Sequence, residues 1–148
     1  MTPTAQHIHP AGHWSGPATT CHLDYESRFL RRKVLRADDA STFLVDLAQT
    51  TSLNHGDAFE LSDGRLIEVI AAQETLLEIT APDLHRIAWH IGNRHCPCQI
   101  EETRLLIQPD HVIRDMLEKI GAQLRDVTEP FTPEGGAYGH GRTHGHAH

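Results

Sequence analysis

The chain has 148 residues, of which 39% are hydrophobic and 22% are charged, a composition typical of one ordinary domain or two small ones. Its formal net charge of −7 argues against a nucleic-acid partner, because nucleic-acid-binding domains usually carry basic patches. No apolar run approaches the roughly 20 residues needed to span a bilayer, and the first residues lack the basic start and apolar run of a secretory signal. We therefore expect a cytoplasmic protein with no membrane partner.

The first half of the chain is predicted to be a flexible arm followed by a β-rich domain. Residues 1–20 are rich in Pro, Gly, Thr and His and show little apolar periodicity, which is typical of a flexible arm. Residues 21–74 contain several short runs of strand composition, and the Ser-Asp-Gly at 62–64 is a strong hairpin signal. His55 lies beside Gly56 and is interpreted as a turn residue.

Two helices are predicted in the second half. The first has a start signal in Thr80, Pro82 and Asp83 and a stop signal in Gly92–Asn93. Its apolar face is predicted to consist of Leu84, Ile87, Ala88 and Ile91. The second is predicted to begin at Pro109–Asp110 and to end at Gly121, with Ile113, Met116, Leu117 and Ile120 on its apolar face.

Short strand patterns surround these two helices. The order over residues 75–134 is strand, helix, strand, strand, helix, strand, which is the split βαβ pattern of a ferredoxin-like domain. The predicted fold class is therefore α+β: a small all-β N-terminal domain, then a ferredoxin-like βαββαβ domain. Residues 135–148 are rich in Gly and His and are predicted to form a disordered tail.

Histidine is the unusual component of this chain. The 13 histidines equal the combined number of Lys and Arg. Four of them lie in the tail at His140, His144, His146 and His148, and imidazoles on a flexible chain can surround a nickel, copper or zinc ion. The tail is therefore predicted to bind metal, although an inert tail or a purification tag would have a related composition.

A second group of donors lies at the end of the first predicted helix. His90, His95, Cys96 and Cys98 fall within nine residues. One imidazole is too few for a specific site, but a two-fold dimer brings the same residue of both subunits together, so that a single His95 becomes two ligands. Cys96-Pro97-Cys98 is not the C-x-x-C of zinc sites, and the two thiols are interpreted as small structural residues.

No catalytic motif is apparent. The sequence lacks a G-x-S-x-G, a P-loop, an H-E-x-x-H and a dinucleotide-binding fingerprint. We therefore predict no catalytic and no cofactor-binding residue, and a protein that is not an enzyme. A zinc hydrolase that uses His90, His95 and Cys98 is an alternative, but it needs three convergent ligands.

Four segments resemble one known family in the correct order. H-I-G-N-R-H-C-P-C-Q-I at 90–100 resembles the H-L-G-N-R-H-x-P-x-Q-I motif of the UreE family of urease accessory nickel chaperones. The segments at 63–79, 110–117 and 130–139 are similar to further motifs of that family. The resemblance covers residues 21–148.

This resemblance implies a homodimer joined through the ferredoxin-like domain, with His95 at the interface and the tail histidines as further ligands. It also implies Ni(II) as cargo, with Zn(II) and Cu(II) as competitors, since both bind nitrogen ligands well. The implied partners are the urease assembly GTPase (UreG) and the urease apoprotein complex. A histidine-rich metal buffer with no role in delivery is the alternative function.

Two features depart from the family pattern. Some members carry His-x-His just before the second helix, whereas this chain has Pro109, Asp110 and His111 there, so only one histidine of that extra site is present. Cys96 and Cys98 stand where the family commonly has apolar residues. Their position beside His95 would allow softer metal binding or oxidation.

Overall fold

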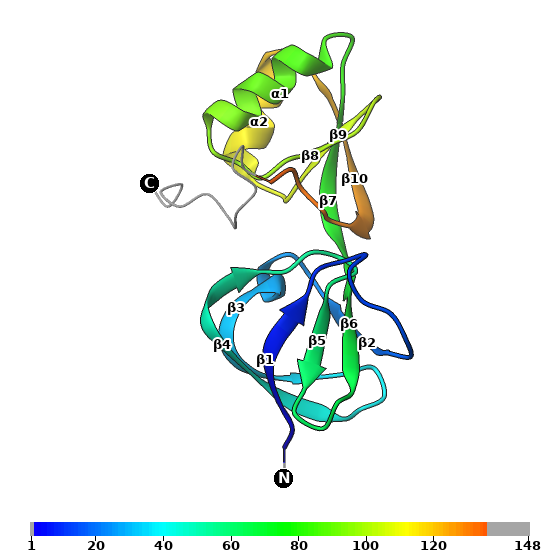
Figure 1. Cartoon of the computed structure of the whole chain (residues 1–148). Helices are drawn as coiled ribbons and strands as arrows, with labels where there is room; N and C mark the ends of the chain where they lie inside the picture. The colour runs from blue at the N-terminus through cyan, green and yellow to red at the C-terminus, as the bar shows by residue number, and fades with distance from the viewer. Residues whose placement is uncertain (1, 136–148) are drawn as a thin grey trace. The chain divides into compact units, whose positions relative to one another are not determined.

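The computed structural model describes residues 2–135 of the chain. The chain divides into two compact units between Ala72 and Gln73 (Figure 1). The predicted tail, apart from Gly135, lies outside the described residues. Within the part that is described, no helix is long and apolar enough to cross a membrane.

The first unit is a curled six-stranded sheet. Its strands are β1 (Thr4–His9), β2 (Thr19–Leu23), β3 (Phe29–Arg36), β4 (Thr42–Ser52), β5 (Ala58–Leu61) and β6 (Leu66–Ala71), and a short 3-10 helix, η1 (Glu26–Arg28), precedes β3. The strand order is β2-β6-β5-β1-β4-β3, in which β1 with β4 and β2 with β6 are parallel pairs. The predicted all-β N-terminal domain is confirmed.

The prediction of a flexible arm over residues 1–20 is wrong. Strand β1 lies inside the sheet between β4 and β5, and Ala5 is fully buried. The loop after β1 is also fixed, because the Trp14 indole donates a hydrogen bond to the Gly56 carbonyl (2.8 Å) and the Ala11 amide donates to Asp57 (2.9 Å). The strand was missed because its order comes from backbone pairing with two distant strands, which local apolar periodicity does not reveal.

The core of the first unit follows the alternation of its strands. Phe43, Val45 and Leu47 of β4 are buried, while their neighbours along the strand are more exposed, as expected when alternate side chains point to opposite faces. The Phe43 and Phe59 rings pack with centroids 5.3 Å apart. The predicted hairpin is present between β5 and β6, and Gly64 at its turn has a φ of 90°.

The second unit has the predicted order of strands and helices. Its elements are β7 (Gln73–Thr80), α1 (Leu84–Asn93), β8 (Gln99–Ile100), β9 (Leu105–Ile107), α2 (His111–Lys119) and β10 (Gln123–Pro130). The strands form an antiparallel sheet in the order β10-β7-β9-β8. This is the ferredoxin-like arrangement, so the predicted fold class is confirmed.

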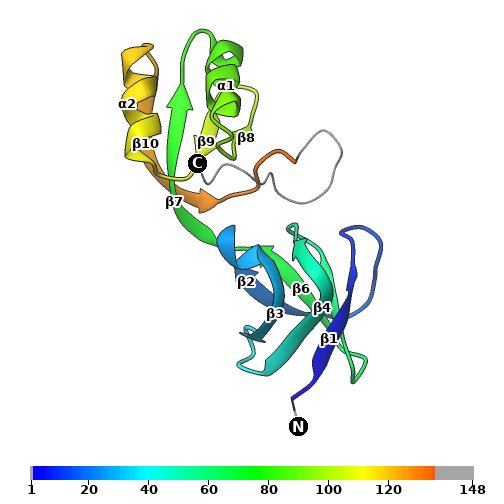
Figure 2. The ribbon, with the colours of Figure 1, turned by 90° about the vertical axis from the view of Figure 1, so that its left-hand side faces the viewer.

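Both helices cover the same face of this sheet (Figures 1 and 2). Ile87 and Ile91 of α1 and Ile113 and Leu117 of α2 are buried, in agreement with the spacing in the sequence. They form one cluster with buried residues of β7 and β9, namely Leu77, Ile79, Leu105 and Ile107. This shared core fixes the two helices, and with them the segments that follow α1 and precede α2.

The two helices begin differently. Helix α2 starts at the predicted place, and Asp110 caps it, because its carboxylate accepts hydrogen bonds from the amides of Val112 (2.9 Å) and Ile113 (3.1 Å). The predicted start of α1 is wrong in detail. The helix begins at Leu84 after Asp83, whose side chain makes no capping hydrogen bond and instead lies 3.1 Å from the Arg86 guanidinium.

Candidate metal site

Helices α1 and α2 end in the same type of turn. At the end of α2 the Gly121 amide bonds the Glu118 carbonyl (3.1 Å) and the Ala122 amide bonds the Leu117 carbonyl (3.0 Å). Gly121 has a φ of 88°. This pair of bonds, with a left-handed residue between them, is the Schellman motif, in which glycine is the usual left-handed residue.

In α1 the left-handed position is occupied by His95. The His95 amide bonds the Gly92 carbonyl (2.9 Å), the Cys96 amide bonds the Ile91 carbonyl (3.4 Å), and His95 has a φ of 57°. The helix ends at Asn93, which confirms the stop predicted at Gly92–Asn93, and the chain then turns at His95. The sequence pattern placed the end of the helix, but it did not show that the left-handed position, three residues after Gly92, is occupied by a histidine.

The left-handed conformation of His95 costs free energy and determines where its side chain lies. A side chain in the left-handed region costs about 1 kcal/mol relative to glycine. The reversal of the chain leaves the His95 side chain exposed at the end of the helix, while the next residue, Cys96, packs against the core. The structure thus holds His95 on a rigid turn at the surface, where a metal ion or a second subunit could reach it.

Cys96 and Cys98 have the structural character predicted for them. Both are half-buried and pack against the core cluster of the second unit. Burial raises the pKa of the Cys96 thiol to about 11 and that of Cys98 to about 12. Without a metal both thiols are therefore protonated at neutral pH, and a metal ion would have to displace the proton to bind the thiolate form.

His90 does not accompany His95 into a site. It lies on α1, is half-buried, and its ring makes an edge contact with Trp89 at a centroid distance of 5.1 Å. The described residues contain no group of three or more His, Cys, Asp or Glu that could hold a metal ion. The convergent set of His90, His95 and Cys98 that a zinc hydrolase would need is therefore not formed within the described part of one chain.

Three histidines of the first unit have structural contacts. His9 lies 3.0 Å from Glu60, and His22 lies 2.6 Å from Asp38. In His55, Nδ1 accepts a hydrogen bond from the Ala71 amide (3.0 Å), which fits the predicted role in a turn. The four predicted tail ligands, His140, His144, His146 and His148, lie outside the described residues.

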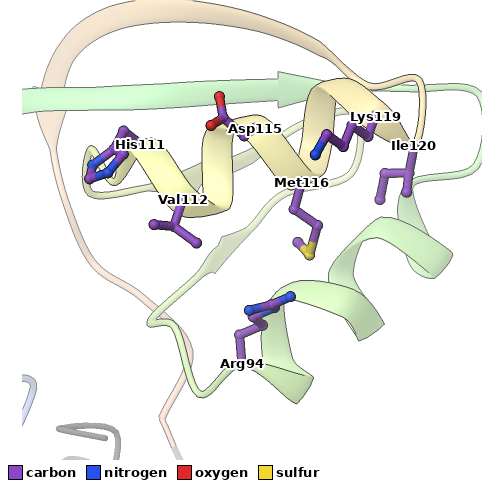
Figure 3. A pocket seen from close by; sticks show the side chains of 7 residues that line it. All are labelled: Arg94, His111, Val112, Asp115, Met116, Lys119 and Ile120. Atoms are coloured by element: carbon purple, nitrogen blue, oxygen red, sulfur yellow. The ribbon is translucent and has the colours of Figure 1, made fainter.

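An open groove lies beside the turn that carries His95. It has a volume of about 560 Å³ and runs along α2 opposite Arg94 (Figure 3). Val112 and Ile120 on its wall are 53% and 40% exposed. Its lining residues are Arg94, His111, Val112, Asp115, Met116, Lys119 and Ile120. Of the apolar face predicted for α2, Met116 is half-buried and packs against the core cluster while also lining the groove, whereas Ile120 is exposed on the groove wall.

A charged network on the sheet was not predicted from the sequence. Arg104 lies 3.0 Å from Glu101, 2.9 Å from Glu78 and 2.6 Å from Glu129. In the sequence, Glu101 is followed by a second acidic residue, Glu102, and nothing there indicates an arginine partner. Glu78 of β7 and Glu129 of β10 both contact Arg104 because the two strands pair in the sheet. These residues are far apart in the sequence, so the sequence does not reveal the contact.

These features define a two-domain protein in which a ferredoxin-like unit presents one histidine on a rigid turn at its surface. Comparison with known families matches residues 3–72 to the N-terminal domain, and residues 74–148 to the C-terminal domain, of the UreE urease accessory protein. The chain therefore belongs to the UreE family. Members of this family are accessory proteins that deliver nickel during urease maturation and are not enzymes, so the predicted class of function is confirmed.

Individual relatives are similar over nearly the whole chain. A urease accessory protein UreE of Ruegeria pomeroyi is 69% identical over 146 residues, which cover 99% of this chain and 98% of the relative. UreE of a second Ruegeria strain is 62% identical, over 95% of this chain and 80% of the relative. UreE of Cereibacter sphaeroides is 58% identical, over 99% of this chain and 80% of the relative.

Proposed function

We propose that this protein carries Ni(II) at a site shared by two chains, in which the His95 side chains of a homodimer are the fixed ligands. The observation that carries this proposal is the geometry of His95, an exposed imidazole on a strained turn at the end of α1. Since the described part of one chain holds no group of three donors, a second chain is the simplest source of another fixed ligand. The tail histidines His140, His144, His146 and His148 complete the coordination.

The groove beside His95 supports a dimer through this face. Val112 and Ile120 expose apolar side chains there, and Arg94 and Lys119 lie on the same surface as Asp115. A two-fold axis near this surface would place apolar groups against apolar groups and basic groups near acidic groups. We propose a second copy of the chain as the occupant.

The ligand set determines which metals compete. Imidazole nitrogens bind Ni(II), but also Cu(II) and Zn(II), and the Irving–Williams order favours copper over nickel. As thiolates, Cys96 and Cys98 would favour softer metals, but burial raises the pKa of both thiols and keeps them protonated without a metal. We propose that Ni(II) is the cargo, with Zn(II) and Cu(II) as competitors. Selection of nickel then depends on which metal is available in the cell and on the partners that receive it, and not on the ligands alone.

Delivery requires that the metal leave again. Tail ligands can dissociate one at a time while the ligands of a partner attach, which lowers the barrier to transfer. The proposed recipients are the urease assembly GTPase (UreG) and the urease apoprotein complex, in the cytoplasm. The relatives that carry the name urease accessory protein support this choice of pathway.

A reconstituted urease activation assay tests delivery. Apo-urease and its assembly GTPase are incubated with limiting nickel and a competing chelator, with the full chain or with the His95→Ala variant. We expect the full chain to raise urease activity and the variant to do so several-fold less. Equal nickel binding with no gain in urease activity would instead identify the protein as a metal buffer.

A further inference from the structure

Strand β3 is an open edge of the sheet in the first unit. It stands at one end of the strand order, and among the described strands it pairs only with β4. Leu30 and Leu35 anchor it in the core, each with 7% of its surface exposed. Residues 31–34 between these anchors are exposed, and Val34 is 59% exposed. An edge strand of this kind presents backbone groups to which a further strand can bond.

The alternation of hydrogen bonds identifies the backbone groups that face outward. Leu44 of β4 is the register partner of Val34, but its amide donates to the Pro3 carbonyl (2.8 Å), next to β1. Val34 therefore belongs to a pair that exchanges no hydrogen bonds. Because bonded and non-bonded pairs alternate along an antiparallel ladder, Arg32 belongs to another such pair. The N–H and C=O groups of Arg32 and Val34 thus point away from β4.

The far end of β3 is closed by strand β2. The Arg36 carbonyl, which continues the same alternating series, accepts a hydrogen bond from Cys21 Sγ (3.4 Å). Just beyond it, the Asp38 amide donates to the Thr20 carbonyl (2.8 Å). No backbone hydrogen bond of this kind reaches residues 31–34 within the described part of the chain. The open part of the edge is therefore short and lies between Leu30 and Leu35.

This open edge is strongly basic. Strand β3 has eight residues, of which none is acidic, in a chain with a net charge of −7. Its basic residues are Arg31, Arg32, Lys33 and Arg36. Arg32 lies 3.6 Å from Asp46, which is the one ion pair that β3 forms with a described residue. Charged side chains on an edge strand also prevent aggregation, but charges of either sign would serve that purpose, whereas here all have the same sign.

The geometry points to strand β3 as a docking site for an extended acidic segment of a partner protein, which adds a strand to the sheet beside Arg32 and Val34. Backbone hydrogen bonds supply affinity, and carboxylates next to Arg31, Arg32 and Lys33 supply specificity. A second copy of β3 carries the same charge and is repelled. The residues of this chain after Glu134 contain no Asp or Glu, so they do not match the edge either. The first unit, which contributes none of the proposed nickel ligands, thus has a role in partner binding.

A fluorescein-labelled synthetic peptide of alternating Glu and Thr tests this docking site on the full-length protein. Fluorescence anisotropy gives the affinity, and NMR spectra of the 15N-labelled protein give the location. We expect binding that weakens as salt is added and that shifts the amide resonances of Arg32 and Val34. A peptide of alternating Lys and Thr is the matched control and should not bind.

Methylation of the peptide backbone separates strand addition from attraction between charges. The amides of alternate residues in a strand face the same edge, so N-methyl groups on the odd residues and on the even residues block opposite edges of the peptide. We expect one of these two peptides to bind at least about tenfold more weakly, because it loses two hydrogen bonds. The other should bind like the unmodified peptide.

Substitutions in the protein test the same two contributions. Val34→Pro removes the outward N–H but no hydrogen bond to β4, and should weaken peptide binding about fivefold. Val34→Thr keeps the N–H and should leave the affinity unchanged. Lys33→Glu should weaken binding several-fold. Its control is Arg65→Glu, at an exposed arginine of the first unit that lies 3.0 Å from Asp63, and this variant should bind the peptide normally.

Each outcome bears on the docking site. If the acidic peptide does not bind, or if it shifts amide resonances only outside β3, the assignment is overturned. Equal binding of both methylated peptides would show that charge alone attracts the peptide and would overturn strand addition. The methylated peptides are used with the unmodified protein, so this result does not depend on how well Val34→Pro folds.

Discussion

His95 is the residue on which the proposed metal site depends. It occupies the left-handed position of a helix-ending turn, which Gly121 occupies in the equivalent turn of α2. The protein thus accepts a backbone strain of about 1 kcal/mol at a place where glycine would serve the fold better. A strained residue with an exposed side chain is the pattern expected when the side chain has a role beyond folding.

The strain can be measured with a pair of substitutions. His95→Gly should raise the free energy of unfolding of the second unit by about 1 kcal/mol, because glycine adopts the left-handed conformation without a steric penalty. Gly121→Ala should lower it by about 1 kcal/mol for the opposite reason, and no steric clash would add to this, since a Cβ at Gly121 meets nothing within 4 Å. Urea denaturation followed by the circular dichroism of the two helices gives both values.

Gly92→Ala is the control for this pair. Gly92 lies within α1, has no positive φ, and a Cβ there also meets nothing within 4 Å. Alanine should therefore stabilise the helix by roughly 0.5–1 kcal/mol through helix propensity alone. If His95→Gly destabilised the second unit instead, the histidine would make a stabilising contact that outweighs its strain.

At the scale of elements, the helices and strands of the second unit could be predicted well from the sequence. The apolar spacing of α1 and α2 predicted the buried residues Ile87, Ile91, Ile113 and Leu117, because helix periodicity is a local signal. The strand β1 could not be predicted in this way. Its place in the sheet depends on pairing with β4 and β5, which lie far away in the sequence.

In the candidate site, too, local features could be predicted from the sequence and contacts between distant segments could not. His95 was identified from its resemblance to a family motif, but its left-handed conformation was hidden, because glycine is the usual residue at that position of a helix-ending turn. The contact between Gln99 and Thr132 was also hidden, since the two residues lie 33 positions apart in the sequence. Contacts between distant segments have no local pattern of residue types, whereas caps and apolar faces do.

The charged network around Arg104 predicts how the stability of the second unit depends on pH. Hydrogen bonds from Arg104 hold the pKa values of Glu78 and Glu129 below the ordinary carboxyl value. Groups with a lowered folded-state pKa stabilise the protein above the unfolded pKa, about 4.3 for Glu, and this contribution is lost as the pH falls through the folded value. We therefore expect the free energy of unfolding to decrease below about pH 4.5.

Arg104→Met tests the origin of this dependence. The variant should be less stable at neutral pH by about 1–3 kcal/mol, since partly buried carboxylates lose their partner. It should also lose less stability on acidification than the unmodified protein, as measured by urea denaturation at a series of pH values. The same fall in stability with acid in both proteins would show that other carboxyl groups are responsible.

At the scale of the whole molecule, the account requires two chains. Every proposed ligand belongs to the second unit or the tail, while His9, His22 and His55 of the first unit have structural contacts. A single His95 per chain implies that the tight site contains half an ion per chain. The number of bound ions therefore distinguishes a shared site from a site within one chain.

The most direct test of this account is nickel titration of the full-length chain with His140, His144, His146 and His148 replaced by Asn, followed by calorimetry and by light scattering for the oligomeric state. We predict one tight Ni(II) per two chains in a dimer, and the loss of this site in the same chain with His95→Gly while the dimer and its folding persist. One tight ion per chain, or an unchanged affinity after His95→Gly, would contradict a nickel site shared through His95.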